Sequence, residues 1–392
     1  VTGQDRTPSS IAASELREKH FEPFKEAMQA GALSIMVNSA SNNGMPFHCN
    51  TELLTQWVKE DLNWDGMIVT DWADINNLYT RERVASSLKE AVKLAVNAGI
   101  DMSMVPYNCQ FAIDLKELVE EGEVPMSRID DAVRRVLRLK FRLGLFDQPD
   151  TVLEDYPEFG GEAHAKLAYE AALESEVLLK NNGILPLQQG KNVLLVGRWA
   201  KTAPQGGGSS KVKGFNQVTS EQALLNSLRA KVTAIEKPNF IQLQKAEVVI
   251  VATGTYDSEG TERPFQMEEE DEALVRMACA ANKNVIVLVL SGSGIDMSAW
   301  NDKVSAIIYG WYPGQSGMQA IADIMVGKIN PSGKLPATIE KKFKDSPAYG
   351  MIPTGASLRK AKGNPNELWF APKTYDVHYN ESVLVGYRWY EA

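Results

Sequence analysis

The stretch WDGMIVTDWADI, residues 64–75, predicts a short buried strand that delivers one carboxylate, Asp71, to its end. Residues 67–69 are continuously apolar, as in a parallel strand that is covered on both faces. Parallel α/β folds place their chemistry at the carboxyl ends of such strands. Because Trp72 follows at once, the pair indicates a carboxylate beside an aromatic surface that suits a sugar ring. The alternative is that Asp71 only caps the next helix or turn.

Length and composition describe an ordinary globular protein of two domains. The 392 residues are many for one core, and 44% are hydrophobic and 23% charged. The net charge of −9 argues against a nucleic acid or an anionic membrane as partner, and no apolar run is long enough to cross a bilayer. The cysteines (Cys49, Cys109 and Cys279) are widely spaced and the four histidines form no HExxH pair, so we expect neither a metal nor another cofactor.

Strands and helices alternate over residues 1–147, with connections long enough for parallel pairing. The apolar patterns predict strands at 32–37, 67–69 and 100–105, and helices at 14–31, 51–60, 83–97 and from Ser127. In the last helix Asp130 stands in capping-box position, and we expect its apolar residues to face inward: Ile129, Val133, Val136, Leu137 and Phe141. Three parallel strands cannot close a barrel, so this segment either extends another sheet or lacks its beginning.

Residues 148–165 hold two prolines, two glycines and five acidic residues, which predicts a linker. The segment 166–345 opens with a predicted helix at 166–179 and then alternates β-branched runs with helical patterns. We expect strands at 192–197, 246–254, 284–292 and 304–310, and helices at 268–281 and 316–326. This rhythm predicts a doubly wound α/β sheet. The tail, residues 346–392, is rich in Pro, Gly, Tyr and Trp and predicts mostly loop.

Two polar loops follow strands of the second domain. The loop QGGGSS, residues 205–210, has neither GxGxxG nor GxxxxGK[ST], so a backbone that approaches a small polar ligand, or plain turn flexibility, fits better than a nucleotide site. The loop 255–263 carries Asp257, Glu259, Glu262 and Arg263. It is either a solvated surface loop or a ligand site, because strand-end loops bind ligands in such sheets. A carboxylate in a partly closed cleft can serve there as an acid.

Glycoside hydrolysis needs two carboxylates across the scissile bond, one that attacks or activates water and one that protonates the departing oxygen. Asp71 from the first domain and Glu259 from the second would satisfy this need if a cleft lies between the domains. The hypothesis is therefore a sugar-cleaving site that both domains share.

At this point the chain resembles glycoside hydrolase family 3, of the β-glucosidase type. Matching stretches run nearly end to end and include LLTQWVKEDLNWDGMIVTDWADI (53–75), RIDDAVRRVLRLKFRLGLFD (128–147), LLKNNGILPL (178–187), SEGTER (258–263) and WYPGQSGMQAIADIMVGKINPSGKLPATI (311–339). Taken together, the order and spacing of these stretches are specific to that family. The resemblance implies the C-terminal part of a (β/α)8 barrel over residues 1–147, a linker, and an α/β sandwich over 166–345. The tail would lead toward a fibronectin-like domain, and the opening barrel strands with their sugar-binding residues are absent.

The resemblance also implies residue roles. Asp71 is expected to be the nucleophile of a retaining, exo-acting mechanism, and Glu259 the general acid/base, with Glu262 second and Asp257 third for that role. Substrate-binding residues are expected at Trp72, Met36, Ser39, Gly207, Ser209, Ser210 and Arg263. Two positions depart from the family pattern: Ser39 stands where many relatives have tyrosine, and GGGSSKV stands where some have tryptophans.

The expected partner is a β-glucoside or oligosaccharide, together with either the missing N-terminal barrel segment as a separate chain or a second copy in a homodimer. The resemblance implies a periplasmic or secreted protein. Two alternatives stay open. One is the β-N-acetylhexosaminidase branch of the family, whose His-Asp dyad the sequence does not display. The other is a sugar-binding remnant with impaired catalysis.

Overall fold

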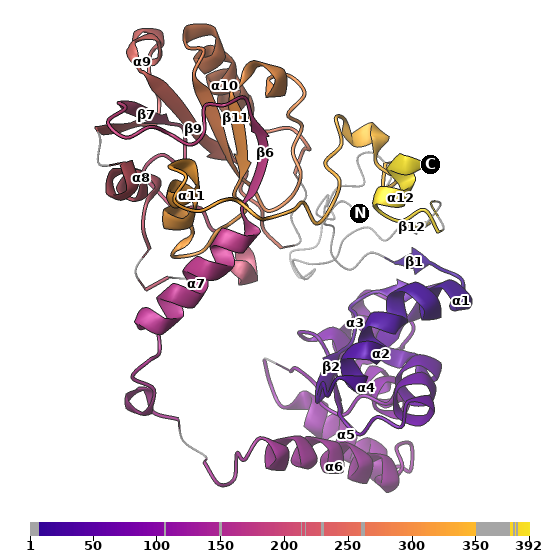
Figure 1. Ribbon diagram of the computed structural model, residues 1–392. Helices are drawn as coiled ribbons and strands as arrows, with labels where there is room; N and C mark the ends of the chain where they lie inside the picture. The colour runs from indigo at the N-terminus through magenta and orange to yellow at the C-terminus, as the bar shows by residue number, and fades with distance from the viewer. Residues whose placement is uncertain are drawn as a thin grey trace. The chain divides into compact units, whose positions relative to one another are not determined.

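The computed structural model describes residues 8–105, 107–148, 151–212, 214–215, 217–228, 231–259, 263–349, 377–378, 381 and 383–392. The chain divides into two compact units, whose ribbons run from indigo to purple and from magenta to yellow in Figure 1. The first unit holds the described residues of Arg6–Thr151 together with 377–378, and the second holds those of Val152–Gly350 and 381–392. Each unit has a hydrophobic core of its own.

The first unit is built on a parallel strand pair, β2 (Ser34–Met36) and β5 (Met67–Val69), which confirms the predicted strand before Asp71. The predicted third strand at 100–105 is wrong, because only a single parallel bridge joins Val69 to Met102. Beside that bridge the Asp101 carboxylate accepts from the Ile68 N–H at 2.9 Å. A side chain thus replaces part of the strand ladder. A second small sheet has the order β12 (Val377–His378), β1 (Ser9–Ser10), β3 (Ser41–Asn42), β4 (Met45–Pro46).

Helices surround this pair. They are α1 (Ala13–Glu15), the π-helix η1 (Leu16–Phe21), α2 (Glu22–Gln29), η2 (Phe47–Cys49), the π-helix η3 (Glu52–Asp61), α3 (Asp74–Thr80), α4 (Leu88–Ala98), α5 (Gln110–Glu120) and α6 (Met126–Arg142). The first three form one run, whose N-cap is Ala12. Pro23 lies just after the junction of the π-helix η1 and α2, and the run continues through it. The sequence did not predict α5.

Two helix predictions in this unit are wrong in detail. The helix expected from residue 83 begins at Leu88, because Ser87 caps it by accepting from the Glu90 N–H. The capping box expected at Ser127 is absent, since α6 begins at Met126 after Pro125 and Ser127 therefore lies inside the first turn. The apolar side of α6 faces inward only in part, because Ile129 packs against the core of this unit whereas Val133, Leu137 and Phe141 are exposed.

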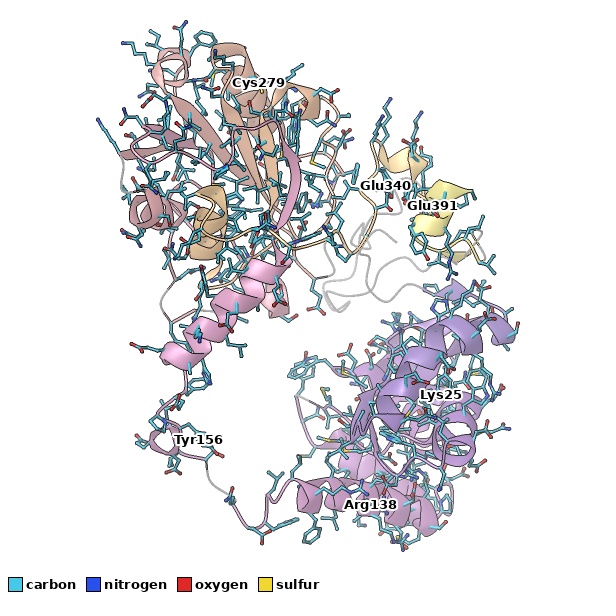
Figure 2. The ribbon with its side chains drawn as sticks, viewed as in Figure 1. Lys25, Arg138, Tyr156, Cys279, Glu340 and Glu391 are labelled. Carbon is cyan, nitrogen blue, oxygen red and sulfur yellow. The ribbon has the colours of Figure 1, made fainter. Side chains whose placement is uncertain are left out.

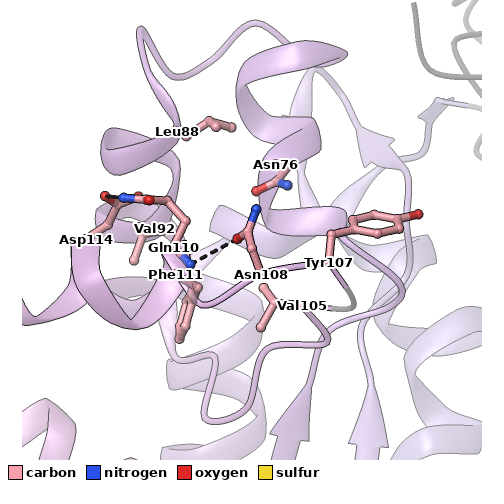
Figure 3. A pocket seen from close by; sticks show the side chains of 9 residues that line it. All are labelled: Asn76, Leu88, Val92, Val105, Tyr107, Asn108, Gln110, Phe111 and Asp114. Atoms are coloured by element: carbon pink, nitrogen blue, oxygen red, sulfur yellow. Dashed lines mark hydrogen bonds between the residues drawn. The ribbon is translucent and has the colours of Figure 1, made fainter.

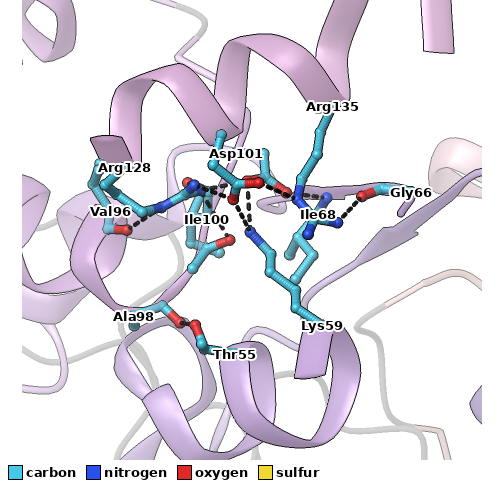
Figure 4. A network of polar contacts seen from close by, with 12 residues as sticks. Thr55, Lys59, Gly66, Ile68, Val96, Ala98, Ile100, Asp101, Arg128 and Arg135 are labelled. Atoms are coloured by element: carbon cyan, nitrogen blue, oxygen red, sulfur yellow. Dashed lines mark hydrogen bonds and ion pairs between the residues drawn. The ribbon is translucent and has the colours of Figure 1, made fainter. Parts of the chain in front are cut away.

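A buried ionic network holds the start of β5 (Figure 4). The Lys59 ammonium lies 2.7 Å from Oδ1 of Asp101, and Arg128 contacts the same oxygen. Arg135 donates to the carbonyls of Trp64 and Gly66 at 2.8 and 2.9 Å. Burial lowers the pKa of Lys59, while Asp101 opposes that shift. The network thus joins two helices to the strand that presents Asp71: η3, which precedes β5 in the chain, and α6, which follows it.

The second unit contains a six-stranded sheet in the order β6 (Val177–Asn181), β11 (Ala306–Tyr309), β10 (Val285–Leu290), β9 (Val248–Gly254), β7 (Val193–Val196), β8 (Val232–Ile235). All neighbours pair in parallel except β6, which runs antiparallel to β11. The four predicted strands are confirmed. The sequence missed β8 and assigned part of β6 to a helix, because a leucine-rich run has the same local signal in both states and only pairing with β11 decides it.

Helices cover both faces of this sheet (Figure 1). The helices and short turns are η4 (Leu153–Asp155), α7 (Glu162–Ser175), η5 (Gly208–Ser210), α8 (Ser220–Leu228), α9 (Phe240–Lys245), α10 (Glu269–Ala281), η6 (Asn301–Lys303), α11 (Gly317–Met325), η7 (Phe343–Asp345) and α12 (Tyr387–Glu391). One core cluster joins the sheet to α8 and α11, and the other joins it to α9 and α10. The parallel strands reverse their order between β7 and β9, which makes that crevice the expected ligand site of a doubly wound sheet.

Side chains of the described residues (Figure 2) add three facts. Among the described residues no helix is long and apolar enough to span a bilayer, and no three metal-ligating side chains gather into a cluster. The cysteines are free, and burial raises the pKa of the Cys49 thiol to about 11 and also raises that of Cys279 on α10.

Candidate active site

Asp71 lies two residues beyond β5, at the carboxyl end of the parallel pair, where it is partly buried. Ser39, which follows β2, donates from its hydroxyl to Oδ2 of Asp71 at 2.7 Å. The backbone N–H of Trp72 donates to Oδ1 at 2.6 Å. The N-cap of α3 is Ala73, so Asp71 does not cap that helix. Each carboxylate oxygen therefore has a donor that fixes the orientation of the side chain.

Met36 and Trp72 present apolar surface at these strand ends, because 53% of Met36 and 55% of Trp72 are exposed. The Trp72 indole donates to the hydroxyl of Tyr107 at 3.1 Å, and the two rings meet edge to face with centroids 6.3 Å apart. The sequence prediction did not include Tyr107. The sequence could have indicated Tyr107 only through its position, because it follows the bridge residue Met102 at the end of the same strands. Trp72 and Tyr107 together form an aromatic surface of the kind that packs against sugar rings.

A buried polar group lies close to Asp71 and was not predicted. His48 Nε2 is 3.8 Å from Oδ2 of Asp74, and both side chains are almost inaccessible. Burial lowers the pKa of His48 to about 4, with Arg81 adding to the shift and Asp74 opposing it. His48 is therefore neutral at pH 7. Arg81 in turn donates to the backbone carbonyl of Ser39 and forms an ion pair with Glu82.

Glu259 lies in the second unit, in the loop after β9 at the point where strand order reverses. This loop meets the glycine loop that follows β7 through a parallel bridge between Gly207 and Ser258. The Ser209 hydroxyl donates to Oε2 of Glu259, which is exposed. A Cβ at Gly207 would lie 2.6 Å from the Tyr256 hydroxyl oxygen. It would also lie 2.9 Å from the Cβ of Ser258, which cannot rotate away, so glycine at 207 favours the close approach of the two loops.

Asp257 is a carboxylate that braces its own loop. It accepts from the Gly292 N–H at 2.7 Å and from the Thr255 hydroxyl at 2.9 Å, and it forms an ion pair with Arg263. Burial would raise the pKa of Asp257, but the Arg263 guanidinium and these hydrogen bonds outweigh burial and hold that pKa below its usual range. A carboxyl group that stays ionised cannot donate a proton, which argues against Asp257 for the acid role.

Arg263 and Ser210 have structural contacts that the sequence did not predict. Arg263 also donates to the hydroxyl of Ser293 at 2.6 Å and to the carbonyl of Gly294 at 3.1 Å, so its guanidinium is engaged inside the protein. Ser210 donates to the carbonyl of Gly207 at 2.7 Å and closes its own turn. These contacts show that both residues hold their loops in place, and their predicted part in substrate binding stays a prediction.

The remaining predicted residues divide between the units. Ser39, Met36 and Trp72 lie with Asp71 in the first unit, and Gly207 and Ser209 lie with Glu259 in the second. Glu262 lies outside the described residues. That Asp71 and Glu259 act on one sugar ring stays a prediction.

A small pocket adjoins the aromatic surface, because Tyr107 belongs to both (Figure 3). Its volume is about 80 Å³, and its polar lining consists of Asn76, Asn108, Gln110 and Asp114. The side-chain amide of Gln110 donates to Asp114 at 2.8 Å, and its backbone N–H donates to the side chain of Asn108 at 3.0 Å. Asn108 and Asp114 are thus both hydrogen-bonded to Gln110.

Comparison with known families gives a match in each unit. Residues 2–139 match the glycosyl hydrolase family 3 N terminal domain, and residues 176–387 match the glycosyl hydrolase family 3 C-terminal domain. The lysosomal beta glucosidase of Dictyostelium discoideum is 34% identical over 382 residues, which cover 86% of this chain and 46% of that protein. Beta-glucosidase BoGH3A of Bacteroides ovatus is 28% identical, with 96% and 53% covered. The chain thus spans about half the length of these curated relatives.

Solved structures agree on the fold. A beta-glucosidase from Listeria innocua in complex with glucose superimposes with a TM-score of 0.82 at 24% identity, covering 96% of this chain and 55% of that one. The exo-beta-xylosidase XlnD gives a TM-score of 0.76 at 27% identity, with 86% and 46% covered. These likenesses confirm the predicted fold class, the C-terminal part of a (β/α)8 barrel followed by an α/β sandwich. With a family domain matched in both units, the chain belongs to glycosyl hydrolase family 3.

Proposed function

We propose that this chain supplies both catalytic carboxylates of a retaining, exo-acting β-glycosidase that removes terminal β-D-glucosyl residues. The observation that carries the proposal is the position of Asp71: partly buried at a strand end, held by Ser39 at 2.7 Å, and next to the exposed indole of Trp72. A fixed carboxylate beside an aromatic surface is what attack on a bound sugar ring requires.

In the proposed reaction an oxygen of Asp71 bonds to the anomeric carbon while the bond to the leaving oxygen breaks. Glu259 gives its proton to that oxygen, so the aglycone departs as an alcohol. In the second step water attacks the anomeric carbon, the bond to Asp71 breaks, and Glu259 takes the proton from water. Ser209 orients Glu259 through its hydroxyl. The double displacement retains the anomeric configuration.

The glucosyl preference rests on the names of relatives. Four relatives are described as β-glucosidases, whereas others are named beta-xylosidase or exo-alpha-(1->6)-L-arabinopyranosidase. A β-glucoside or β-gluco-oligosaccharide is therefore our proposed substrate. We also propose that a second polypeptide takes part in the site, either an N-terminal barrel segment supplied as a separate chain or a second copy of this chain.

The test is covalent trapping. The chain is incubated with 2,4-dinitrophenyl 2-deoxy-2-fluoro-β-D-glucoside, alone and with a family N-terminal barrel segment added, and digested for mass spectrometry. We expect one fluoroglucosyl adduct on the peptide that holds Asp71, and none in Asp71→Ala. Asp130→Ala, an exposed aspartate on α6, is the matched control and should label normally.

An adduct on another residue would reject the nucleophile assignment. Saccharide binding without an adduct in either mixture would favour the remnant with impaired catalysis. Faster turnover of an aryl N-acetyl-β-glucosaminide than of the aryl glucoside would favour the hexosaminidase branch.

A further inference from the structure

We propose that Ser39 and Arg81 are positioning residues for Asp71: Arg81 fixes the loop that carries Ser39, and Ser39 fixes the carboxylate. The inference rests on the proposed function, because it assigns the support of the proposed nucleophile. It also gives Ser39 a role toward the protein's own carboxylate instead of toward the sugar.

The contacts form a chain of three links. The Ser39 hydroxyl reaches Oδ2 of Asp71 at 2.7 Å, and only 8% of Ser39 is exposed, so solvent does not replace this donor. The Ser39 carbonyl accepts from Nη2 of Arg81. Nε of Arg81 donates to Glu82 at 2.6 Å, which sets the plane of the guanidinium. The Arg81 and Glu82 side chains are 7% and 12% exposed, and a charged hydrogen bond is stronger at such burial than in water.

The topology explains how Arg81 can hold the loop that carries Ser39. Ser39 follows β2 by three residues, in the loop between β2 and β3. Arg81 is the C-cap residue of α3, the helix that begins three residues after Asp71. The polypeptide that presents the carboxylate therefore returns, after a short helix, to fasten the neighbouring loop that donates to it. The segment that runs from β5 through α3 therefore both carries Asp71 and holds the loop that carries Ser39.

Charges around the group leave this arrangement in place at neutral pH. His48, Cys49, Asp74 and Glu82 are titratable neighbours, and His48 and Cys49 are uncharged there because their pKa values are about 4 and about 11. Arg81 is thus the cation that faces this group, and its Nη1 atom is buried with no hydrogen-bond partner among the described residues. An arginine-to-lysine change would keep the charge and remove the fork that spans Ser39 and Glu82.

A double-mutant cycle tests the linkage. Ser39→Ala, Arg81→Gln and the double variant are assayed with an aryl β-glucoside, in whichever mixture turns over the unmodified chain. We expect kcat to fall about 10- to 100-fold in each single variant with KM little changed, which is the range for losing a bond to a charged group. The double variant should be no slower than Ser39→Ala, because Arg81 acts through Ser39. Arg83→Gln, an exposed arginine in the same loop that bonds the Thr80 carbonyl, should stay within twofold.

A second readout needs no turnover. Carbodiimide modification of Asp71 is followed by peptide mapping against pH, and its midpoint should move up by about one pH unit in Ser39→Ala and in Arg81→Gln, since a lost donor favours the protonated carboxyl. Arg81→Lys should fall between the unmodified chain and Arg81→Gln. Multiplicative rate losses in the double variant, or an unmoved midpoint, would overturn the inference. Failure of the proposed function is separate, because it appears as full activity in Asp71→Ala.

Discussion

Oδ1 of Asp101 lies 2.7 Å from the ammonium nitrogen of Lys59, and the two side chains are 0% and 7% exposed. Oδ2 of the same carboxylate accepts from the backbone N–H of Ile68 in β5. One buried aspartate therefore joins a π-helix to the strand that ends at Asp71. The position of the candidate nucleophile depends on this ion pair as well as on the contacts that Asp71 makes itself.

Asp101→Asn should destabilise the first unit by about 3–5 kcal/mol, because it removes the fully buried carboxylate that Lys59 and Arg128 share and leaves them the partly exposed Asp131. The measurement is urea unfolding, followed by tryptophan fluorescence of the transition that belongs to this unit. Lys89→Met is the control, since Lys89 bridges Glu117 and Glu121 at the surface and its loss should change little. An Asp101→Asn midpoint equal to that of the unmodified chain would show that the network carries no stability.

Glu259→Ala should slow substrates with poor leaving groups far more than activated aryl glycosides, because only the former need a proton at the departing oxygen. Azide should restore turnover of activated substrates as the glycosyl azide, and the comparison is kcat/KM over a series of aryl leaving groups. Glu174→Ala, at an exposed glutamate on α7, is the control. Equal losses across the series would move the acid role to Glu262.

His48 should make the stability of the first unit fall in acid. Its pKa is lowered from 6.5 to about 4 in the folded chain, mainly by burial, so its contribution is complete above pH 6.5 and is lost as the pH falls toward 4. The slope from this one group approaches about 1.4 kcal/mol per pH unit in that window. His48→Asn should flatten the curve of unfolding free energy against pH. The exposed His164→Asn should leave it unchanged, and a parallel curve for His48→Asn would contradict the prediction.

Glu176 should destabilise the second unit at neutral pH. Its side chain is fully buried, neither carboxylate oxygen has a hydrogen-bond partner in the described part of the chain, and burial raises its pKa well above 4.5. A raised folded pKa means that stability is complete below pH 4.5 and declines as the pH rises. Glu176→Leu should therefore raise the melting temperature at pH 7, and the gain should shrink toward pH 4. Glu174→Leu on the exposed side is the matched comparison, and a gain that does not vary with pH would refute the assignment.

The sequence predicted those elements whose signal is local. Continuous β-branched runs gave β7, β9, β10 and β11, because a strand covered on both faces is apolar at every position. The apolar run at 67–69 gave β5 and placed Asp71 at its end for the same reason. The order and spacing of the motifs indicated the family, which the matches in both units confirm.

Tertiary structure decided what depends on partners far away in the chain. The edge strand β6 exists because it pairs with β11, and the third predicted strand is reduced to one bridge because Asp101 takes an amide of β5. The contacts of Ser39 with Asp71 and of Arg263 with Asp257 span turns whose course no local pattern records. A residue type states which bonds a side chain can make, and only the folded chain determines which partner is within reach.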